Sequence, residues 1–340
     1  MNRQWRLAVA TSAVAASLAG CGAPDLAAMR PTVQKSAVLV EVVGAPPFAP
    51  SASQLGTAGA TSVEVVHVAL GEWQSVAAHA LAKGQLTGVM VVCDDANAVA
   101  SGLNQLAADH PDVRFLVVSN WPASQITSGN VEDVAQDPVA VAYSIGALCG
   151  DWIASSTSTS GAVYSGVPSI VYAPRGATVA EQKAFFTGLY QANPNVRVVA
   201  LPQPAAQSLS SYGYAVDLGV VGGSPAAGEL SALRSAAPAW AAFGTSPIAG
   251  FAISPGHLSS SEAVQAFQAL VSPDAWHSGE HLVLDLSSVA FDDKQVPATV
   301  IAAWAKLEVN AIAAAAQSNA AFASLPPSVR SDLANAFHLS

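Results

Sequence analysis

The chain has 340 residues, of which 51% are hydrophobic and only 11% are charged. This composition excludes an intrinsically disordered protein, and the length suits two domains of about 150 residues each. The formal net charge of −10 argues against nucleic acid or an anionic lipid surface as a ligand.

The first residues have the pattern of a secretory signal peptide. Arg3 and Arg6 precede an apolar run at 7–18. This run is shorter than the roughly 20 residues that a membrane-spanning helix needs. Leu18-Ala19-Gly20-Cys21 follows, and this tetrapeptide resembles the lipobox of bacterial lipoproteins.

The lipobox implies that Cys21 carries a lipid. We expect residues 1–20 to be the lipoprotein signal peptide and residues 21–34 to form a lipidated tether. Acyl chains on Cys21 would anchor the protein to the cell membrane, on its extracytoplasmic face. The alternative is an ordinary signal peptide with a chance cysteine.

The first half of the mature chain alternates strands and helices. Short β-branched runs predict strands buried on both faces, at 35–43, 62–70, 86–93 and 113–118. Helical spacing predicts helices at 72–83, 96–109 and 139–153. The polar stretch at 155–161 (SSTSTSG) is the predicted first crossover between two lobes.

The same alternation restarts after that stretch. Strands are predicted at 162–164 with a possible extension at 169–172, and at 196–201, 214–221, 240–243, 250–253 and 281–286. Helices are predicted at 178–193, 226–236, 261–271, 297–317 and 327–337, and Ser259 or Ser260 is expected to cap the third of these.

This order predicts an α/β fold of two Rossmann-like lobes, each a parallel sheet flanked by helices, with a ligand cleft between them. The N-terminal lobe is expected to comprise residues 35–157 plus about 281–317, and the C-terminal lobe residues 158–280. Residues 318–340 are expected to form a C-terminal extension.

Together with the lipobox, this pattern resembles a type I periplasmic binding protein. Three segments are similar to the basic membrane protein (BMP) family of nucleoside-binding lipoproteins: 107–118, 137–152 with Tyr143 and Gly146, and 185–199. The resemblance implies a monomeric solute-binding lipoprotein that passes a nucleoside-like solute to an ABC permease.

The chain departs from that family where the ligand is held. The family's acidic "D.SFN" segment is replaced by residues 44–50, where Phe48 alone can supply a stacking aromatic ring. The aspartate that grips the ribose is replaced by Ser119-Asn120-Trp121, and the lysine that follows Ser254 is missing. A second hypothesis is therefore a BMP-like lipoprotein that has lost its ligand and has a regulatory or envelope-interaction role.

Several other residues are candidate ligand contacts, each with a plainer alternative. Asp94 and Asp95 follow a strand and either bind a polar ligand or cap a helix, while Asn120 and Trp121 offer an amide and a stacking ring or pack in a core or hinge. Gly222 and Gly223 either present backbone N–H groups or form a tight turn. Ser254 and His257 lie at the expected lobe crossing, where His257 is otherwise a surface-loop residue.

No catalytic or metal-binding pattern is present in the sequence. There is no G-x-S-x-G, CxxC or HExxH motif, and the seven histidines form no recognisable pair. We expect neither an enzyme nor a cofactor. Cys93 and Cys149 are predicted to be two separate buried thiols, although export would permit a disulfide.

Overall fold

The computed structural model describes residues 37–56, 62–159, 169–201, 217–223, 225, 233, 237, 239–244, 250–272, 274–276, 281–284 and 288–339. Residues 156–159 and 281–284 are described in their backbone only. Cys21 and the predicted signal peptide and tether lie outside these residues.

The first lobe is built on a six-stranded sheet in the order β11-β5-β4-β3-β1-β2. All of its strand pairs are parallel. The strands are β1 (Ala37–Val43), β2 (Ser62–Val68), β3 (Gly88–Asp95), β4 (Arg114–Trp121), β5 (Val131–Gln136) and β11 (His281–Leu284). β-Branched residues fill the central strands because both faces of the sheet are covered.

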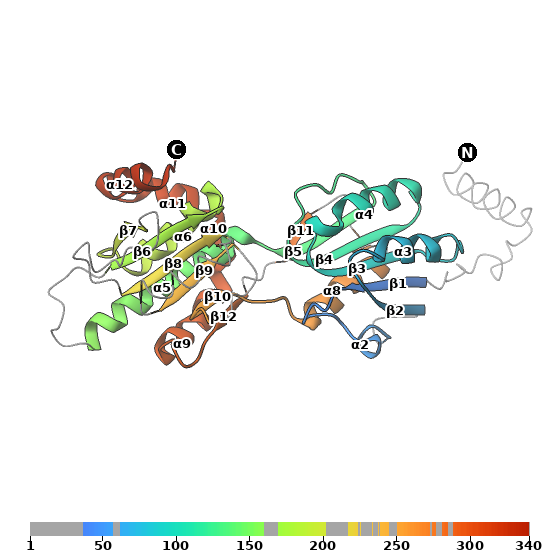
Figure 1. The fold of residues 1–340 in the computed structure, drawn as a ribbon, viewed down its shortest axis with the longest axis horizontal. Helices are drawn as coiled ribbons and strands as arrows, with labels where there is room; N and C mark the ends of the chain where they lie inside the picture. Colours follow the sequence, from blue (N-terminus) through green and yellow to red (C-terminus); the bar gives the residue numbers. More distant parts are fainter. Residues whose placement is uncertain are drawn as a thin grey trace, which may run out of the picture. The chain divides into compact units, whose positions relative to one another are not determined.

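Successive side chains of β3 pack into different cores. Val91 and Cys93 lie in a core with α3 (Trp73–Leu81) and α4 (Asn97–Asp109), whereas Met90 and Val92 lie in a core with α8 (Ser260–Val271). Figure 1 shows α3 and α4 on one side of this sheet and α8 on the other. The short helix α2 (Ala52–Gly56) adds Leu55 to the α8 core.

The second lobe has a six-stranded sheet in the order β12-β10-β9-β8-β6-β7. Its strands are β6 (Ser169–Arg175), β7 (Arg197–Ala200), β8 (Leu218–Gly223), β9 (Trp240–Phe243), β10 (Ile253–Pro255) and β12 (Val289–Phe291). Only β12, at the sheet edge, runs antiparallel to its neighbour.

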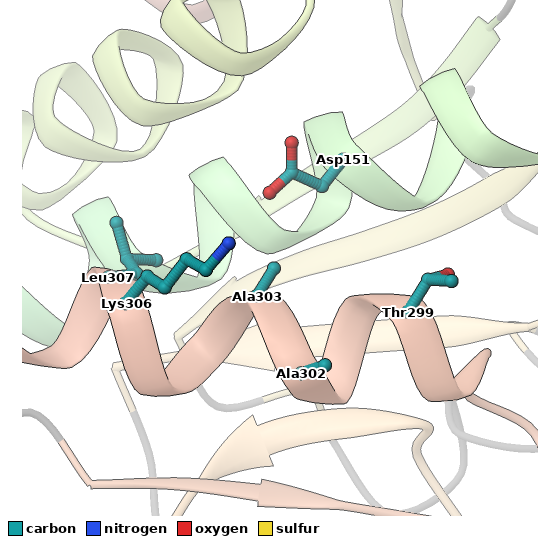
Figure 2. Close-up of a pocket in the computed structure, with 6 residues that line it drawn as sticks. All are labelled: Asp151, Thr299, Ala302, Ala303, Lys306 and Leu307. Carbon is teal, nitrogen blue, oxygen red and sulfur yellow. The ribbon is translucent and has the colours of Figure 1, made fainter.

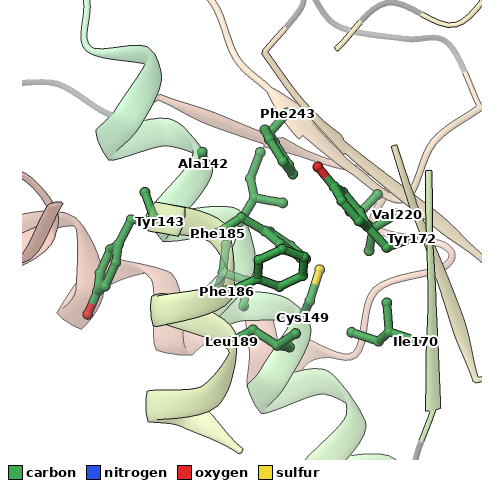
Figure 3. Packing of buried hydrophobic residues seen from close by; sticks show 14 of the residues in the cluster. Ala142, Tyr143, Cys149, Ile170, Tyr172, Phe185, Phe186, Leu189, Val220 and Phe243 are labelled. Carbon is green, nitrogen blue, oxygen red and sulfur yellow. The ribbon is translucent and has the colours of Figure 1, made fainter. Parts of the chain in front are cut away.

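Helices α5 (Pro138–Thr159) and α6 (Val179–Ala192) cover one face of the second sheet. The core beneath them is aromatic: the rings of Tyr172 and Phe185 stack at 5.5 Å between centroids, and those of Phe185 and Phe243 at 5.0 Å. Figure 3 shows these rings between the helices and the strands, beside Cys149. Such pairs stabilise a core beyond the burial of their area.

The chain ends in helices that belong to the same lobe. They are α9 (Ala298–Leu307), the 3₁₀ turn η2 (Glu308–Asn310), α10 (Ala311–Ala316), α11 (Ser318–Ser324) and α12 (Pro327–Phe337). By length and composition alone, Ala298–Ala316 is apolar enough to cross a membrane. It includes Lys306 and Glu308, and α9 and α10 pack against α5, so we assign it to the lobe.

The fold class predicted from the sequence is confirmed, but the lobe boundaries differ from those expected. The chain crosses between sheets after Gln136, after Pro255 and after Leu284. The first lobe therefore contains residues 37–136 and the stretch from α8 through β11, and the rest of the described chain after β5 belongs to the second lobe. The expected division into 35–157 plus 281–317 and 158–280 placed α5, α8, α9 and α10 in the wrong lobes.

Packing explains this correction. α5 lies against α6 through glycines, because a Cβ on Gly146 would come 2.1 Å from the carbonyl oxygen of Phe185. Residues 155–159 of the polar stretch form the end of α5 rather than a crossover. The predicted extension at 318–340 is part of the second lobe, since Phe322 and Phe337 are in its core.

Most predicted elements are present within a few residues of their expected ends. Four elements of the structure were not predicted: α2, β5, β12 and α11. Ser259 caps α8 in a capping box with Glu262, as predicted. The predicted strand at 162–164 lies outside the described residues, as does nearly all of the predicted helix at 226–236.

Candidate functional site

The polar residues of interest lie at the carboxyl ends of the strands in each parallel sheet. In open α/β sheets these edges are where ligands bind. In the first sheet, Asp95 at the end of β3 is the register partner of Trp121 at the end of β4. In the second sheet, Arg175 at the end of β6 is the register partner of Gly223 at the end of β8.

Asp94 and Asp95 are both exposed at the first edge. The N-cap residue of α4 is Ala96, which has no side-chain cap, and Asp95 instead satisfies the first N–H of the helix. Asp95 Oδ1 accepts hydrogen bonds from the Asn97 backbone N–H at 2.9 Å and from Asn97 Nδ2 at 3.1 Å. Asp94 has no side-chain hydrogen bond among the described residues, so its carboxylate is available to a polar ligand.

Trp121 is half-buried beside these aspartates. Its indole packs against the core of the second lobe, which agrees with the packing alternative. Its Nε1–H is buried and, among the described residues, has no acceptor. The Ser119 hydroxyl donates to the Trp121 carbonyl at 2.7 Å and fixes the backbone at this strand end.

Asn120 is fully buried and its polar atoms are engaged within the protein. Its Nδ2 donates to His257 Nδ1 at 2.9 Å, and its Oδ1 accepts from the Leu258 backbone N–H at 3.0 Å. Gln136 Nε2 also approaches Asn120 Oδ1 at 3.4 Å. Asn120 and His257 are thus brought together, but as partners of each other rather than as open ligand contacts.

Sequence analysis did not identify Gln136 because β5 was not recognised as a strand. Its side chain is completely buried. Nε2 donates to the Gly256 carbonyl at 3.1 Å, and Oε1 accepts from the Ser288 backbone N–H at 3.1 Å. A buried amide needs partners for both its ends, and here the crossovers supply them.

Phe48 is not available to stack on a ligand. It is 1% exposed and packs with Leu55 and Phe267 in the core beneath α8. The loop after β1 therefore folds inward, because a large apolar side chain gains more from burial than from exposure at a strand end.

Gly222 and Gly223 have packing and backbone reasons for being glycine. A Cβ on Gly222 would lie 2.4 Å from the Tyr172 hydroxyl oxygen. Gly223 has φ +101°, a conformation that L side chains rarely adopt, and a Cβ there would lie 2.0 Å from the Arg175 carbonyl oxygen. Close packing against Tyr172 at Gly222 and the left-handed backbone at Gly223 therefore account for the two glycines, which lie in β8 rather than in a tight turn.

The second edge carries polar groups that sequence analysis missed. Arg175 is half-buried, and its Nη1 donates to the neighbouring Pro174 carbonyl at 3.2 Å. Tyr172 has a buried hydroxyl without a partner in the described residues. Burial raises the pKa of Tyr172 above its ordinary value, and the nearby Glu181 carboxylate adds to this. The only sequence signal was a single arginine at the end of a β-branched run.

Ser254 is buried in β10 and lines a pocket of about 400 Å³ along β10 and β12, with Phe251, Phe291 and Asp292 among its other walls. A second pocket of about 530 Å³ lies between α5 and α9, away from the strand ends. Figure 2 shows Lys306 of α9 projecting toward α5, which carries Asp151. Burial raises the pKa of the Asp151 carboxyl.

No protein-family model matches the sequence, and no curated protein matches it. Among solved structures, an ABC transporter solute-binding protein from Conexibacter woesei aligns with a TM-score of 0.50 and 13% identity, over 81% of this chain and 95% of that one. An ABC transporter solute-binding protein from Aeropyrum pernix aligns with a TM-score of 0.40 and 13% identity, over 89% and 90%. A myo-inositol binding protein from Caulobacter aligns with a TM-score of 0.40 and 16% identity, over 78% and 95%.

The chain therefore has the fold of the type I periplasmic binding proteins. Its two sheets, parallel except at β12, are flanked by helices, and the chain crosses between them three times.

Proposed function

We propose that this protein is an extracytoplasmic solute-binding protein that delivers a small polar molecule to an ABC-type importer. The observation that carries the proposal is the pair of strand-end edges, each beside the crossovers and each bearing ligand-type groups. The first offers a carboxylate on Asp94 and the indole of Trp121. The second carries Arg175, which is half-buried at the end of β6. The role is binding rather than catalysis.

The resemblance to the BMP family favours a nucleoside-like solute. An aromatic face at Trp121 suits a planar ring, since stacking on an aromatic side chain contributes about 1–3 kcal/mol per base in nucleic-acid binders. Asp94 would accept hydrogen bonds from hydroxyl groups. The burial of Phe48 removes the second aromatic face expected from the sequence, so other small polar solutes belong in the test.

The membrane anchor is the second part of this proposal and rests on the lipobox alone. If Cys21 is lipidated, the wild-type chain stays with the membrane fraction of the producing bacterium. Cys21→Ser then moves it to the soluble exported fraction. A soluble wild-type protein would contradict the anchor and leave the solute-binding role intact.

A thermal-shift screen tests solute binding. Protein lacking residues 1–21 is mixed with nucleosides, bases, sugars, amino acids and small peptides at about 1 mM. A ligand at 100 times its Kd stabilises the folded state by about 2.7 kcal/mol, which is a shift of several degrees. Asp94→Asn and Trp121→Leu should abolish the shift. Asp109→Asn, an exposed aspartate at the far end of α4, is the matched control.

A specific observation favours one other role. Phe48 and Asn120, both predicted ligand contacts, are fully buried and engaged within the protein. This supports a lipoprotein that has lost its solute and acts in regulation or in the envelope. A cooperatively folded sample that no solute in the panel stabilises would decide for this alternative.

A further inference from the structure

Gln136 touches all three segments that connect the lobes. Gln136 is itself the last residue of β5, where the first crossover begins. Its side chain donates to Gly256 in the second crossover and accepts from Ser288 in the third. The second and third crossovers also meet directly, because Gly256 N–H donates to the Ser288 carbonyl at 2.9 Å. A Cβ on Gly256 would lie 2.2 Å from the Ser288 hydroxyl oxygen, so the two backbones are in close contact.

Asn120 extends this contact to the end of β4. Its Oδ1 accepts from the Leu258 N–H, and a backbone N–H can only donate. The orientation of the amide is therefore fixed, and Nδ2 must face His257. Since Nδ2 is a donor, His257 Nδ1 must be the acceptor. The imidazole is then held in the tautomer that carries its proton on Nε2.

We propose that Gln136, with Asn120, is a positioning residue that couples the three crossovers, so that they respond as one hinge. The side chains of both residues are 0% exposed, and buried networks of this kind are rigid only while every member is satisfied. The inference deepens the proposed function, because these crossovers adjoin the strand ends assigned to the solute. Every measurement below uses the ligand-free protein. A failure of the coupling proposal can therefore be distinguished from a failure of the solute-binding proposal.

Hydrogen exchange resolved to single amides tests the coupling on the full chain. Gln136→Met keeps the length of the side chain and removes its hydrogen bonds. The Ser288 amide, a direct partner, should exchange at least tenfold faster. The Leu258 amide is bonded to Asn120 and not to Gln136, and coupling predicts that it too speeds up at least tenfold. Acceleration at Ser288 alone would overturn the proposal.

Two controls separate coupling from a general loss of stability. Asn130→Leu removes a side chain whose Nδ2 donates to the carbonyls of Ala107, His110 and Val113, all within the first lobe. This variant should leave Ser288 and Leu258 unchanged. The Val91 amide in the sheet core should be unchanged in Gln136→Met. Equal acceleration of Val91 would mean a structural role only and would overturn the proposal.

If Gln136→Met does not fold, Gln136→Glu provides the second test. Buried beside two carbonyl oxygens, the carboxyl group of this variant stays protonated, so it still accepts from the Ser288 N–H but has one proton where the amide had two. That proton goes to the Gly256 carbonyl, the nearer acceptor, and the bond to Asn120 Oδ1 is lost. The Leu258 amide should then exchange faster while Ser288 changes little. Unchanged exchange at Leu258 would contradict the coupling.

The tautomer gives an independent spectroscopic test. Nitrogen-15 spectra of the histidine side chains at pH 7.5, with His257 assigned from the missing signals of His257→Gln, should show the proton on Nε2. Asn120→Asp replaces the donor by an acceptor and should move the proton to Nδ1. A wild-type His257 with its proton on Nδ1 would overturn the proposed network.

Discussion

Glu41 is a charged residue type in the middle of an otherwise apolar strand. It lies in β1, is 0% exposed, and neither carboxylate oxygen has a hydrogen-bond partner in the described part of the chain. Burial raises the pKa of Glu41 to about 8. The carboxyl group is therefore protonated in the folded protein at neutral pH, because an isolated charge is costly to bury.

This predicts a pH-dependent stability. The unfolded chain loses the Glu41 proton near pH 4.3, whereas the folded chain keeps it to about pH 8. The contribution of the Glu41 proton to the stability of the fold is therefore complete at low pH and is lost as the pH rises through this window. Glu41→Gln has no charge to bury. At pH 9 its free energy of unfolding should exceed that of the wild type by roughly 2–4 kcal/mol, since each pKa unit corresponds to about 1.4 kcal/mol.

Urea unfolding at pH 5.5, 7 and 9 measures this difference. Glu64→Gln, on the exposed side of β2, is the control and should not change the pH dependence. Parallel curves for the wild type and Glu41→Gln across this range would show that Glu41 is ionised in the fold, contrary to the prediction.

Gly222 offers a second test at single-residue scale. Gly222→Ala places a methyl group 2.4 Å from the Tyr172 hydroxyl oxygen and 2.8 Å from Phe243 Cζ. We expect a loss of about 1–3 kcal/mol in unfolding free energy. Tyr172→Phe removes the hydroxyl, so the same glycine substitution should cost less in that background, as a double-mutant cycle measures.

The control is Gly71→Ala, where a Cβ meets nothing within 4 Å. It should alter stability by less than about 0.5 kcal/mol. If the effects of Gly222→Ala and Tyr172→Phe on the free energy of unfolding are additive, the Tyr172 hydroxyl is not the group that clashes with the added methyl group.

At the scale of elements, the sequence predicted strands wherever apolar side chains fill both faces. β1, β3 and β4 are such strands, and their β-branched runs are unmistakable. β5 was not predicted as a strand because it carries three polar residues, Glu132, Asp133 and Gln136, all of which are buried. Asp133 Oδ2 accepts from the Ala123 N–H at 2.8 Å, a partner ten residues away that a local pattern does not disclose.

The candidate site was predictable to the same extent. Strand ends identified Asp94, Asn120 and Trp121 by position alone, because ligands and polar contacts gather there in α/β folds. Their roles were not predictable. The bond from Asn120 to His257 joins residues 137 positions apart, and Arg175 and Gln136 gain significance only when the sheets are assembled.

The α5–α6 contact is the best-defined helix pair for a test at this scale. A Cβ on Gly146 would lie 2.1 Å from the Phe185 carbonyl oxygen, and one on Gly188 would lie 2.2 Å from the Tyr143 carbonyl oxygen. Both obstacles are backbone, so neither can rotate away. Gly188→Ala should therefore destabilise the protein by about 3 kcal/mol, at the upper end of overpacking effects.

Gly102→Ala in α4 is the matched control. The three atoms nearest to a Cβ there belong to the side chains of Trp73 and Gln74, and alanine favours the helix by up to about 1 kcal/mol. Its net effect on unfolding free energy should be well below that of Gly188→Ala. Equal losses for the two variants would show that the helices can move apart at little cost.

At the scale of the whole molecule, the two lobes have separate cores that each contain one buried free cysteine. Cys93 lies beneath α3 and α4 in the first lobe, and Cys149 lies on α5 in the second. Burial raises the pKa of both thiols, and for Cys93 the carboxylates of Asp133, Asp95 and Asp94 raise it further. Neither should react with an alkylating agent in the folded protein, because the thiolate is the reactive form.

These thiols report on each lobe independently. Gly188→Ala weakens the second core and leaves the first untouched, so Cys149 should become reactive at a lower urea concentration than Cys93 does. In Gly102→Ala, which touches only the first lobe, this order of exposure should not appear. Mass spectrometry of the alkylated peptides assigns each cysteine. If Gly188→Ala lowers the urea midpoint of both thiols equally, the lobes unfold in one transition, and the crossover network transmits stability as well as position.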